Sequence, residues 1–237
     1  MTAAAGPPPG LAPAPAPSVV AERVGELRRR ITAAGRDLST VRIVAVTKGF
    51  EPAAVAAALA AGVHDIGENR AEELLAKAAG FPSAGPGAPR WHYLGAIQRR
   101  RVRDLAPVVS LWQTVARAEE GRAIAAHAPG ATVLVQVDVS GAPGHNGCPP
   151  AQLGALVGEL RAMDLSVAGL MLLAPRGPDD VVRGAMRQVA AEAAAMALPE
   201  VSMGMTGDLD AALAEGTTMV RVGQGLFGPR PVPLRRD

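Results

Sequence analysis

Eight short apolar segments alternate with helix-like segments along the chain, and this alternation constrains the fold more than any other feature. The apolar segments are rich in β-branched residues, which is typical of buried strands, and cover residues 42–47, 63–67, 91–94, 108–112, 132–137, 167–172, 200–203 and 219–222. Between them lie stretches rich in Ala and Leu, including residues 52–61, 71–79, 115–127, 151–163, 179–197 and 208–215. Strands that are apolar throughout predict a parallel sheet with helices on its outer face.

Two architectures satisfy this alternation. The chain has 237 residues, which suits one domain of barrel size. Eight βα units in this length favour an α/β fold with a single (β/α)8 TIM-like barrel. A doubly wound open sheet is the alternative, because a local pattern does not record whether the first and last strands pair.

The N-terminal region differs in composition from the rest of the chain. Residues 1–17 consist almost entirely of Pro, Ala and Gly, which predicts a disordered or polyproline-like tail outside the fold. A helix is expected over residues 19–34, with Ser18 as its N-cap. Its apolar positions share one face and are Val20, Val24, Leu27 and Ile31. We therefore expect one folded domain over residues 18–237.

Charge and cysteine content narrow the classes of function. The 24 basic residues are scattered and nearly balanced by 22 acidic ones, so charge predicts no nucleic-acid partner. The arginine-rich run at residues 99–103 has no interleaved aromatic residues and predicts a solvated helix face. No apolar run reaches the ~18 residues needed to cross a bilayer, so no membrane partner is expected. The lone cysteine, Cys148, fits a reducing cytoplasm, and it lacks metal-ligand spacing to any histidine.

Lys48 ends the first predicted strand, at the barrel edge where the βα loops carry function. Only two of the 24 basic residues are lysines, Lys48 and Lys77. Arginine supplies positive charge elsewhere but cannot form an imine with an aldehyde, so a lysine in this background is a candidate for amine chemistry. Partial desolvation at the barrel mouth favours the uncharged amine. A rim lysine paired with a carboxylate such as Glu68 is the alternative.

The loops after the seventh and eighth strands predict an anion site. Residues 203–208 (MGMTGD) lead into a helix, so their backbone amides and the Thr206 hydroxyl face outward. Residues 222–225 (VGQG) offer further amides, and barrels often bind a phosphate between these two loops. Side-chain alternation places Arg221 inside the barrel, where it needs a partner. A ring nitrogen would serve, and a nearby carboxylate is the alternative.

Taken in order, these motifs resemble the pyridoxal phosphate homeostasis protein family, also called the proline synthase co-transcribed or alanine-racemase-like barrel family. The matching segments are VTK at 46–48, GEN at 67–69, WHYLGAIQ at 91–98, SG at 140–141, GLM at 169–171, SMGMTGD at 202–208 and VRVGQGLFG at 220–228. They all lie within residues 42–228. The segments WHYLGAIQ and SMGMTGD are long enough to be specific for this family.

The resemblance implies a barrel of the fold-type III kind, with pyridoxal 5'-phosphate (PLP) as cofactor. It implies that Lys48 forms the Schiff base with this cofactor. It also implies that Thr206 and the backbones of Gly223 and Gln224 hold the phosphate. Thr206 keeps the hydroxyl of the serine that is usual in the family, whereas Gln224 replaces a Ser or Thr.

The resemblance further implies that Arg221 lies at the pyridine nitrogen and that Asn69 and His92 lie near the cofactor. Two departures from the family pattern fall close to these positions. Arg70 stands where the family usually has tyrosine, and Ala96 replaces a common histidine.

Three functions are considered for such a chain. The first is binding, buffering and delivery of PLP without significant catalytic turnover. Apo forms of PLP-dependent enzymes are then its partners, and a monomer is expected. The alternative is an amino-acid racemase, which needs a base on each face of the cofactor. In racemases a second domain supplies the opposing tyrosine, but here the only tyrosine is Tyr93, and the chain ends nine residues after the FG motif. The third, a pure interaction protein, would not need Lys48 and Arg221 together.

Overall fold

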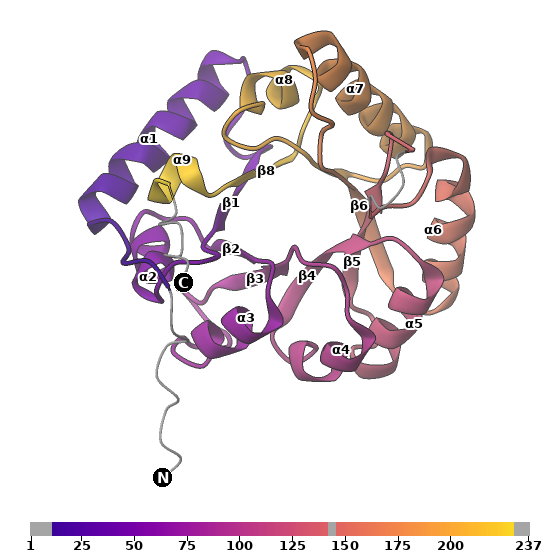
Figure 1. The fold of residues 1–237 in the computed structure, drawn as a ribbon, viewed down its shortest axis with the longest axis horizontal. Coiled ribbons are helices and arrows are strands. Elements are labelled where there is room, and N and C mark those ends of the chain that lie inside the picture. The colour runs from indigo at the N-terminus through magenta and orange to yellow at the C-terminus, as the bar shows by residue number, and fades with distance from the viewer. Residues whose placement is uncertain (1–10, 142–145, 230–237) are drawn as a thin grey trace, which may run out of the picture.

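The eight predicted strands form a closed parallel barrel in which each strand pairs with its neighbours in chain order. The computed structural model describes residues 11–141 and 146–229. The strands are β1 (Arg42–Val46), β2 (Asp65–Glu68), β3 (Arg90–Tyr93), β4 (Val109–Val115), β5 (Thr132–Val137), β6 (Ser166–Leu172), β7 (Glu200–Ser202) and β8 (Met219–Val222). Pairing of β1 with β8 closes the ring, as Figure 1 shows in the view down the barrel. The barrel is therefore confirmed and the open sheet is excluded.

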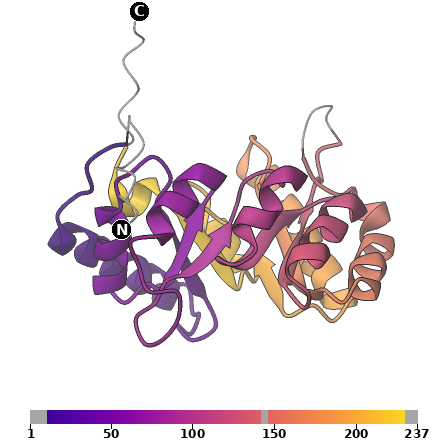
Figure 2. The same cartoon turned by 90° about the horizontal axis from the view of Figure 1, so that it is seen from below.

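Helices surround the ring of strands. They are α1 (Pro17–Ala33), α2 (Ala53–Ala60), α3 (Ala71–Ala78), α4 (Arg99–Leu105), α5 (Ala118–His127), the 3-10 helix η1 (Pro150–Gln152), α6 (Leu153–Ala162), α7 (Asp179–Ala195), α8 (Leu209–Ala214) and α9 (Gln224–Phe227). Helices α1 and α9 lie side by side (Figure 2), where Arg23 Nη1 donates to the Leu226 carbonyl at 2.9 Å. In the described residues, no helix has both the length and the apolar character that a membrane span requires.

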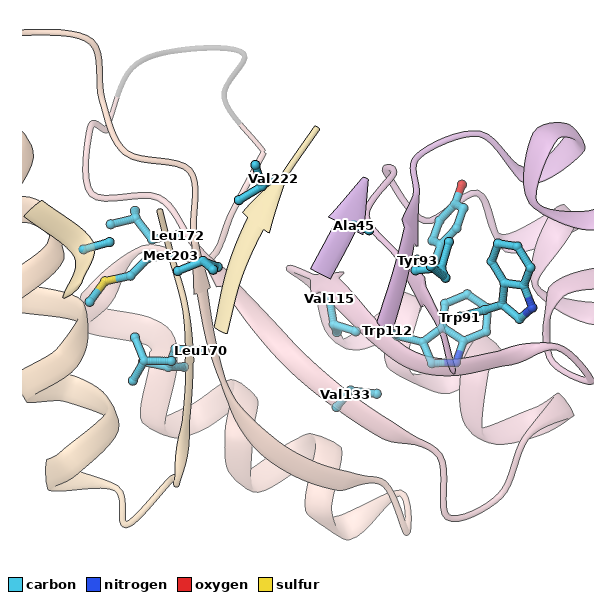
Figure 3. Close-up of a cluster of buried hydrophobic side chains, with 14 of the residues drawn as sticks. Ala45, Trp91, Tyr93, Trp112, Val115, Val133, Leu170, Leu172, Met203 and Val222 are labelled. Atoms are coloured by element: carbon cyan, nitrogen blue, oxygen red, sulfur yellow. The ribbon is translucent and has the colours of Figure 1, made fainter. Parts of the chain in front are cut away.

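The main hydrophobic core lies between the sheet and the helices. Alternate strand residues such as Ala45, Val133 and Leu170 are fully buried there. Tyr93 belongs to the same layer, because its ring packs edge-on against Trp112 with centroids 5.7 Å apart. Figure 3 shows Tyr93 grouped with Trp91 and Trp112. The single tyrosine thus points away from the barrel interior.

The barrel interior holds a second, smaller apolar cluster and several polar side chains. The apolar members are Val44, Leu111, Leu134, Met171 and Met219. Buried polar residues on the same inward faces are His92, Gln113, Gln136, Ser202 and Arg221. Polar groups inside a barrel must be hydrogen-bonded to offset the loss of water, so their contacts determine how the interior is ordered.

The N-terminal boundary differs from the sequence prediction. Residues 1–10 lie outside the described residues, but Ala12 and Ala14 pack against the barrel core. Ala12 is buried and bridges to the segment after β1, donating to the Gly49 carbonyl and accepting from the Glu51 amide at 2.8 Å each. Helix α1 begins at Pro17 with Ala16 as N-cap, and Ser18 is not the cap. Proline suits the first helical position because its φ is already helical and it has no N–H to satisfy.

Strand β4 is longer than predicted and continues to Val115. The sequence predicts a strand that ends at Trp112 and a helix that begins at Val115, with polar Gln113 and Thr114 between them. Both are buried in the structure, and Thr114 donates its hydroxyl proton to the Gly95 carbonyl at 2.6 Å. The arginine-rich run forms α4, whose arginines face mainly outward, and Arg101 pairs with Asp104 at 3.5 Å, as expected for a solvated face.

Candidate cofactor-binding site

A cavity of about 460 Å³ opens at the C-terminal ends of the strands. Six of the seven residues predicted from sequence line it, and these are Lys48, Asn69, Thr206, Arg221, Gly223 and Gln224. Its apolar walls are Val46, Phe50, Leu94, Met171, Leu173 and Met205. An apolar cavity of this size with a few convergent polar groups is typical of a site for a small organic ligand.

Lys48 lies in the turn directly after β1, and the main chain of this turn is held on both sides. The Thr47 carbonyl accepts a hydrogen bond from Lys77 Nζ at 2.8 Å. The Gly49 amide donates to Glu73 Oε2 at 2.7 Å. Gly49 has φ of 78°, a left-handed conformation that a residue with a Cβ adopts only with strain. The position of Lys48 is therefore set by the peptide groups on either side of it.

Three buried charged residues behind the sheet make these contacts, and we call them the α3 clamp: Glu68, Glu73 and Lys77. Lys77 Nζ lies 2.6 Å from Glu68 Oε1 and 3.8 Å from Glu73 Oε2. Lys77 is only 1% exposed and points away from the cavity lining. The second lysine of the chain thus has a structural role, which leaves Lys48 as the amine in the cavity.

Glu68 was considered from sequence as an ion-pair partner of Lys48. It is fully buried, and its Oε1 accepts hydrogen bonds from Lys77 Nζ and from the Thr47 hydroxyl at 2.6 Å each. Burial raises the pKa of Glu68, and the nearby Lys77 ammonium opposes this shift only in part. Arg70, a departure from the family pattern, pairs with Glu73 at 3.2 Å and so supports the clamp from the surface.

Arg221 enters the cavity from β8, as the strand alternation predicted. Its Nη1 donates to Ser202 Oγ at 2.6 Å and its Nη2 donates to the Leu172 carbonyl at 2.7 Å. Both acceptors are neutral, so the carboxylate partner considered from sequence is not what holds the guanidinium. Burial lowers the pKa of Arg221 to about 10, with Asp208 opposing this shift. The side chain therefore remains a cation at neutral pH.

The two loops predicted to bind an anion are joined to each other. The Gly225 amide donates to Thr206 Oγ1 at 3.1 Å, which leaves the Thr206 hydroxyl proton to donate elsewhere. A Cβ at Gly223 would lie 3.2 Å from the Val46 carbonyl oxygen, and one at Gly225 only 2.8 Å from Val222 Cγ1. A side chain at Gly225 would collide with its neighbours and one at Gly223 would be tightly pressed, so glycine at both positions lets the two loops pack closely against each other and against β1. The Met205 amide donates to Asp208 Oδ1 at 2.5 Å, which orders the turn that carries Thr206.

His92 is the one predicted site residue that does not line the cavity. It is buried on β3, where Nε2 contacts Asp65 Oδ1 at 2.9 Å and Nδ1 contacts Gln113 Nε2 at 2.7 Å. Its side chain points into the barrel interior one layer below the cavity. Leu94, two residues further along the chain, lines the cavity itself. The motif placed His92 correctly along the chain but not at the correct depth in the barrel.

Sequence reasoning also missed the apolar walls of the cavity. Val46 and Met171 lie on inward faces near the C-terminal ends of β1 and β6, and Leu94 and Leu173 directly follow β3 and β6. The strand-end rule that selected Lys48 would have found them if it had been applied to apolar residues as well. In the described residues, no group of three or more His, Cys, Asp or Glu side chains is placed to hold a metal ion.

The fold and the lined cavity define a barrel of the alanine racemase type. The family model of the alanine racemase N-terminal domain matches residues 23–231. The pyridoxal phosphate homeostasis protein of Pseudomonas aeruginosa is 34% identical over 226 residues, covering 90% of this chain and 96% of that protein. The protein of the same name from Deinococcus radiodurans is 39% identical over 210 residues, covering 85% and 95%. The chain belongs to the pyridoxal phosphate homeostasis protein family.

A solved structure agrees with this assignment. PipY of Synechococcus elongatus, described as having PLP bound, superposes with a TM-score of 0.77 at 30% sequence identity. The match covers 88% of this chain and all of PipY. Fold and family are therefore supported both by sequence and by structure.

Proposed function

We propose that this protein binds PLP covalently and reversibly on Lys48 and serves its homeostasis in the cell by binding, buffering and delivering the cofactor. The observation that carries the proposal is the cavity itself. It brings together the Lys48 amine, the Arg221 cation and the Thr206 hydroxyl, between apolar walls. The names of the relatives and the cofactor-bound PipY structure support the same ligand.

The residues present fit this cofactor group by group. When bound, PLP supplies an aldehyde that bonds reversibly to a primary amine, and Lys48 would be that amine. Thr206, with the backbone amides of Gly223 and Gln224, would hold the phosphate at the part of the cavity that these residues line. Arg221 would donate a hydrogen bond to the pyridine nitrogen without giving up its proton. Asn69 also lines the cavity and would contact the ring or its substituents.

Two features support cofactor handling over racemisation. Arg221 keeps its own proton at neutral pH and so does not protonate the ring nitrogen, which weakens the ring as an acceptor of electrons. Tyr93, the single tyrosine, is buried against Trp112, donates to the Ala96 carbonyl at 3.3 Å and has its pKa raised by burial. It does not line the cavity and could not act there as a second base.

The experiment is an absorption spectrum of the PLP-loaded protein before and after borohydride, followed by peptide mapping. We expect a visible band that borohydride bleaches and an adduct that maps to Lys48. Lys48→Arg is the matched control, because it keeps the charge and reach of the side chain but cannot form the bond. A normal, reducible band in Lys48→Arg would refute the site.

Turnover is tested separately by exchange of the α-protons of L- and D-amino acids in deuterated water, followed by NMR. The proposal predicts exchange far slower than the ~1 per second typical of slow enzymes. Exchange at that rate or faster, lost in Lys48→Arg, would favour the racemase instead.

The proposal extends to partners and compartment. We place the protein in the cytoplasm as a monomer that passes PLP to apo forms of PLP-dependent enzymes. The buried, free thiol of Cys148 is compatible with a reducing compartment. Reactivation of an apo-enzyme by the loaded protein, but not by loaded protein pretreated with borohydride, is the expected result.

A further inference from the structure

Five polar side chains form a hydrogen-bonded line through the barrel interior, and we call this line the polar chain. It consists of Arg221, Ser202, Gln113, His92 and Asp65, and none of these residues is more than 5% exposed. Consecutive members are 2.6, 2.7, 2.7 and 2.9 Å apart. Arg221 lies at the cavity, whereas Asp65 begins β2 at the opposite end of the barrel.

The two ends of the polar chain determine the direction of every hydrogen bond in it. A guanidinium only donates, so Ser202 Oγ accepts from Arg221 and gives its own proton to Gln113 Oε1. Gln113 then points its amide nitrogen at His92 Nδ1, which must be the unprotonated ring nitrogen. His92 therefore carries its proton on Nε2 and donates it to the Asp65 carboxylate, which only accepts.

The charges around the far end stabilise this single arrangement. Burial pushes the pKa of Asp65 upward, but the hydrogen bonds from His92 and Arg90 outweigh burial and hold that pKa well below its usual range. Burial also lowers the pKa of His92, which Asp65 opposes and Arg42 and Arg90 reinforce. Arg90 holds the carboxylate from outside with contacts of 2.9 and 2.5 Å. Asp65 is thus an anion and His92 a neutral donor.

We propose that Asp65, His92, Gln113 and Ser202 are positioning residues that hold the Arg221 guanidinium in one orientation toward the ligand. An arginine side chain has considerable rotational freedom, and a donor aimed at one ring atom loses affinity if it turns. Ser202 and the Leu172 carbonyl restrain its two terminal nitrogens. Because the links form a series that ends in a carboxylate, each bond polarises the next. This inference rests on the proposed function, since the ligand is taken to be PLP.

The test compares PLP with its analogue in which carbon replaces the ring nitrogen, so that Arg221 has no ring acceptor. Dissociation constants for both ligands are measured for the wild type and for Ser202→Ala, Ser202→Thr and Asp65→Asn. Glu200→Gln is the matched control. Glu200 begins β7 at the same end of the barrel and pairs with Arg42, outside the polar chain.

We expect Ser202→Ala to weaken PLP binding about tenfold, as for loss of a hydrogen bond to a charged group, and to change binding of the analogue less than twofold. Ser202→Thr restores the hydroxyl and should lie within twofold of the wild type. Asp65→Asn should weaken PLP binding about threefold despite its distance from the cavity, and Glu200→Gln should not. Asp65→Asn keeps the test decisive if Ser202→Ala does not fold.

Equal effects of Ser202→Ala and Asp65→Asn on PLP and on the analogue would overturn the inference, because a purely structural role would not distinguish the two ligands. In that case a wild type that still shows the borohydride-sensitive band would leave the proposed function intact. A wild type without that band would refute the proposed function itself. The two failures are therefore separable.

Discussion

The two flanks of the cavity are held by different kinds of interaction. On the Lys48 flank, the α3 clamp holds the main chain through charged groups buried between the sheet and α3. On the Arg221 flank, the polar chain holds the side chain itself through neutral links inside the barrel. A lysine whose amine reacts needs a fixed main chain and a side chain that can still move. An arginine that donates in one direction needs its guanidinium fixed. Each flank provides what its residue requires.

The largest expected effect is a loss of stability, when Lys77→Met removes the cation of the α3 clamp. Removal of one partner of a buried ion pair leaves Glu68 uncompensated, which typically costs about 3–5 kcal/mol of the free energy of unfolding. Arg29→Met is the matched control, since Arg29 pairs with Glu26 on the surface at 2.6 Å and its loss should cost less than ~0.5 kcal/mol. Urea unfolding measures both. Equal losses would mean that burial does not distinguish the two pairs.

The cost of Lys77→Met should also depend on pH. A carboxyl whose folded pKa is raised contributes stability that is present below its unfolded pKa and is lost as pH rises through the folded pKa. Without the Lys77 ammonium, the pKa of Glu68 rises further. The loss of free energy of unfolding in Lys77→Met, relative to the wild type, should therefore be smaller at pH 5 than at pH 8. A deficit that grows on acidification would contradict this assignment of charge.

An intermediate effect is expected at the phosphate loops, where Thr206→Val removes the hydroxyl but keeps the shape. A hydrogen bond to a charged group is worth roughly 1.5–3 kcal/mol, so PLP binding should weaken by about tenfold or more. Pyridoxal, which lacks the phosphate, should bind almost as before. Equal losses for both ligands would mean that Thr206 only supports the Gly225 amide.

The smallest expected effect concerns the protonation of His92. It tests whether the links of the polar chain are neutral, unlike the charged groups of the α3 clamp. Its pKa is lowered by burial, so its neutral form stabilises the fold above about pH 6.5 and this contribution is lost as pH falls through the folded pKa. We expect ¹⁵N spectra of histidine-labelled protein to show His92 protonated on Nε2 alone from pH 6.5 to 8. Asp65→Asn is the control that should disturb this tautomer. A proton on Nδ1 in the wild type would refute the direction assigned to the polar chain.

The sequence and the structure agree best where a residue's role depends on its strand end. Lys48 and Thr206 were placed by their positions after strand ends, Asn69 was placed by the family resemblance, and all three line the cavity. His92 shows the limit of this reasoning. Its motif is conspicuous, but the structure places it below the cavity in contact with Asp65 and Gln113, which no sequence pattern had singled out.

The sequence by itself determined the α/β class, the eight strands and the strand ends at which chemistry gathers. These follow from the period of apolar residues and from backbone preferences, which are local. Only the tertiary structure decided barrel closure, the depth of His92, the burial of Lys77 and the contact of Ala12 with the barrel. These depend on which segments distant in sequence meet. Contacts such as those from Arg221 to Ser202 and from Lys77 to Glu68 form only once the ring of strands has closed.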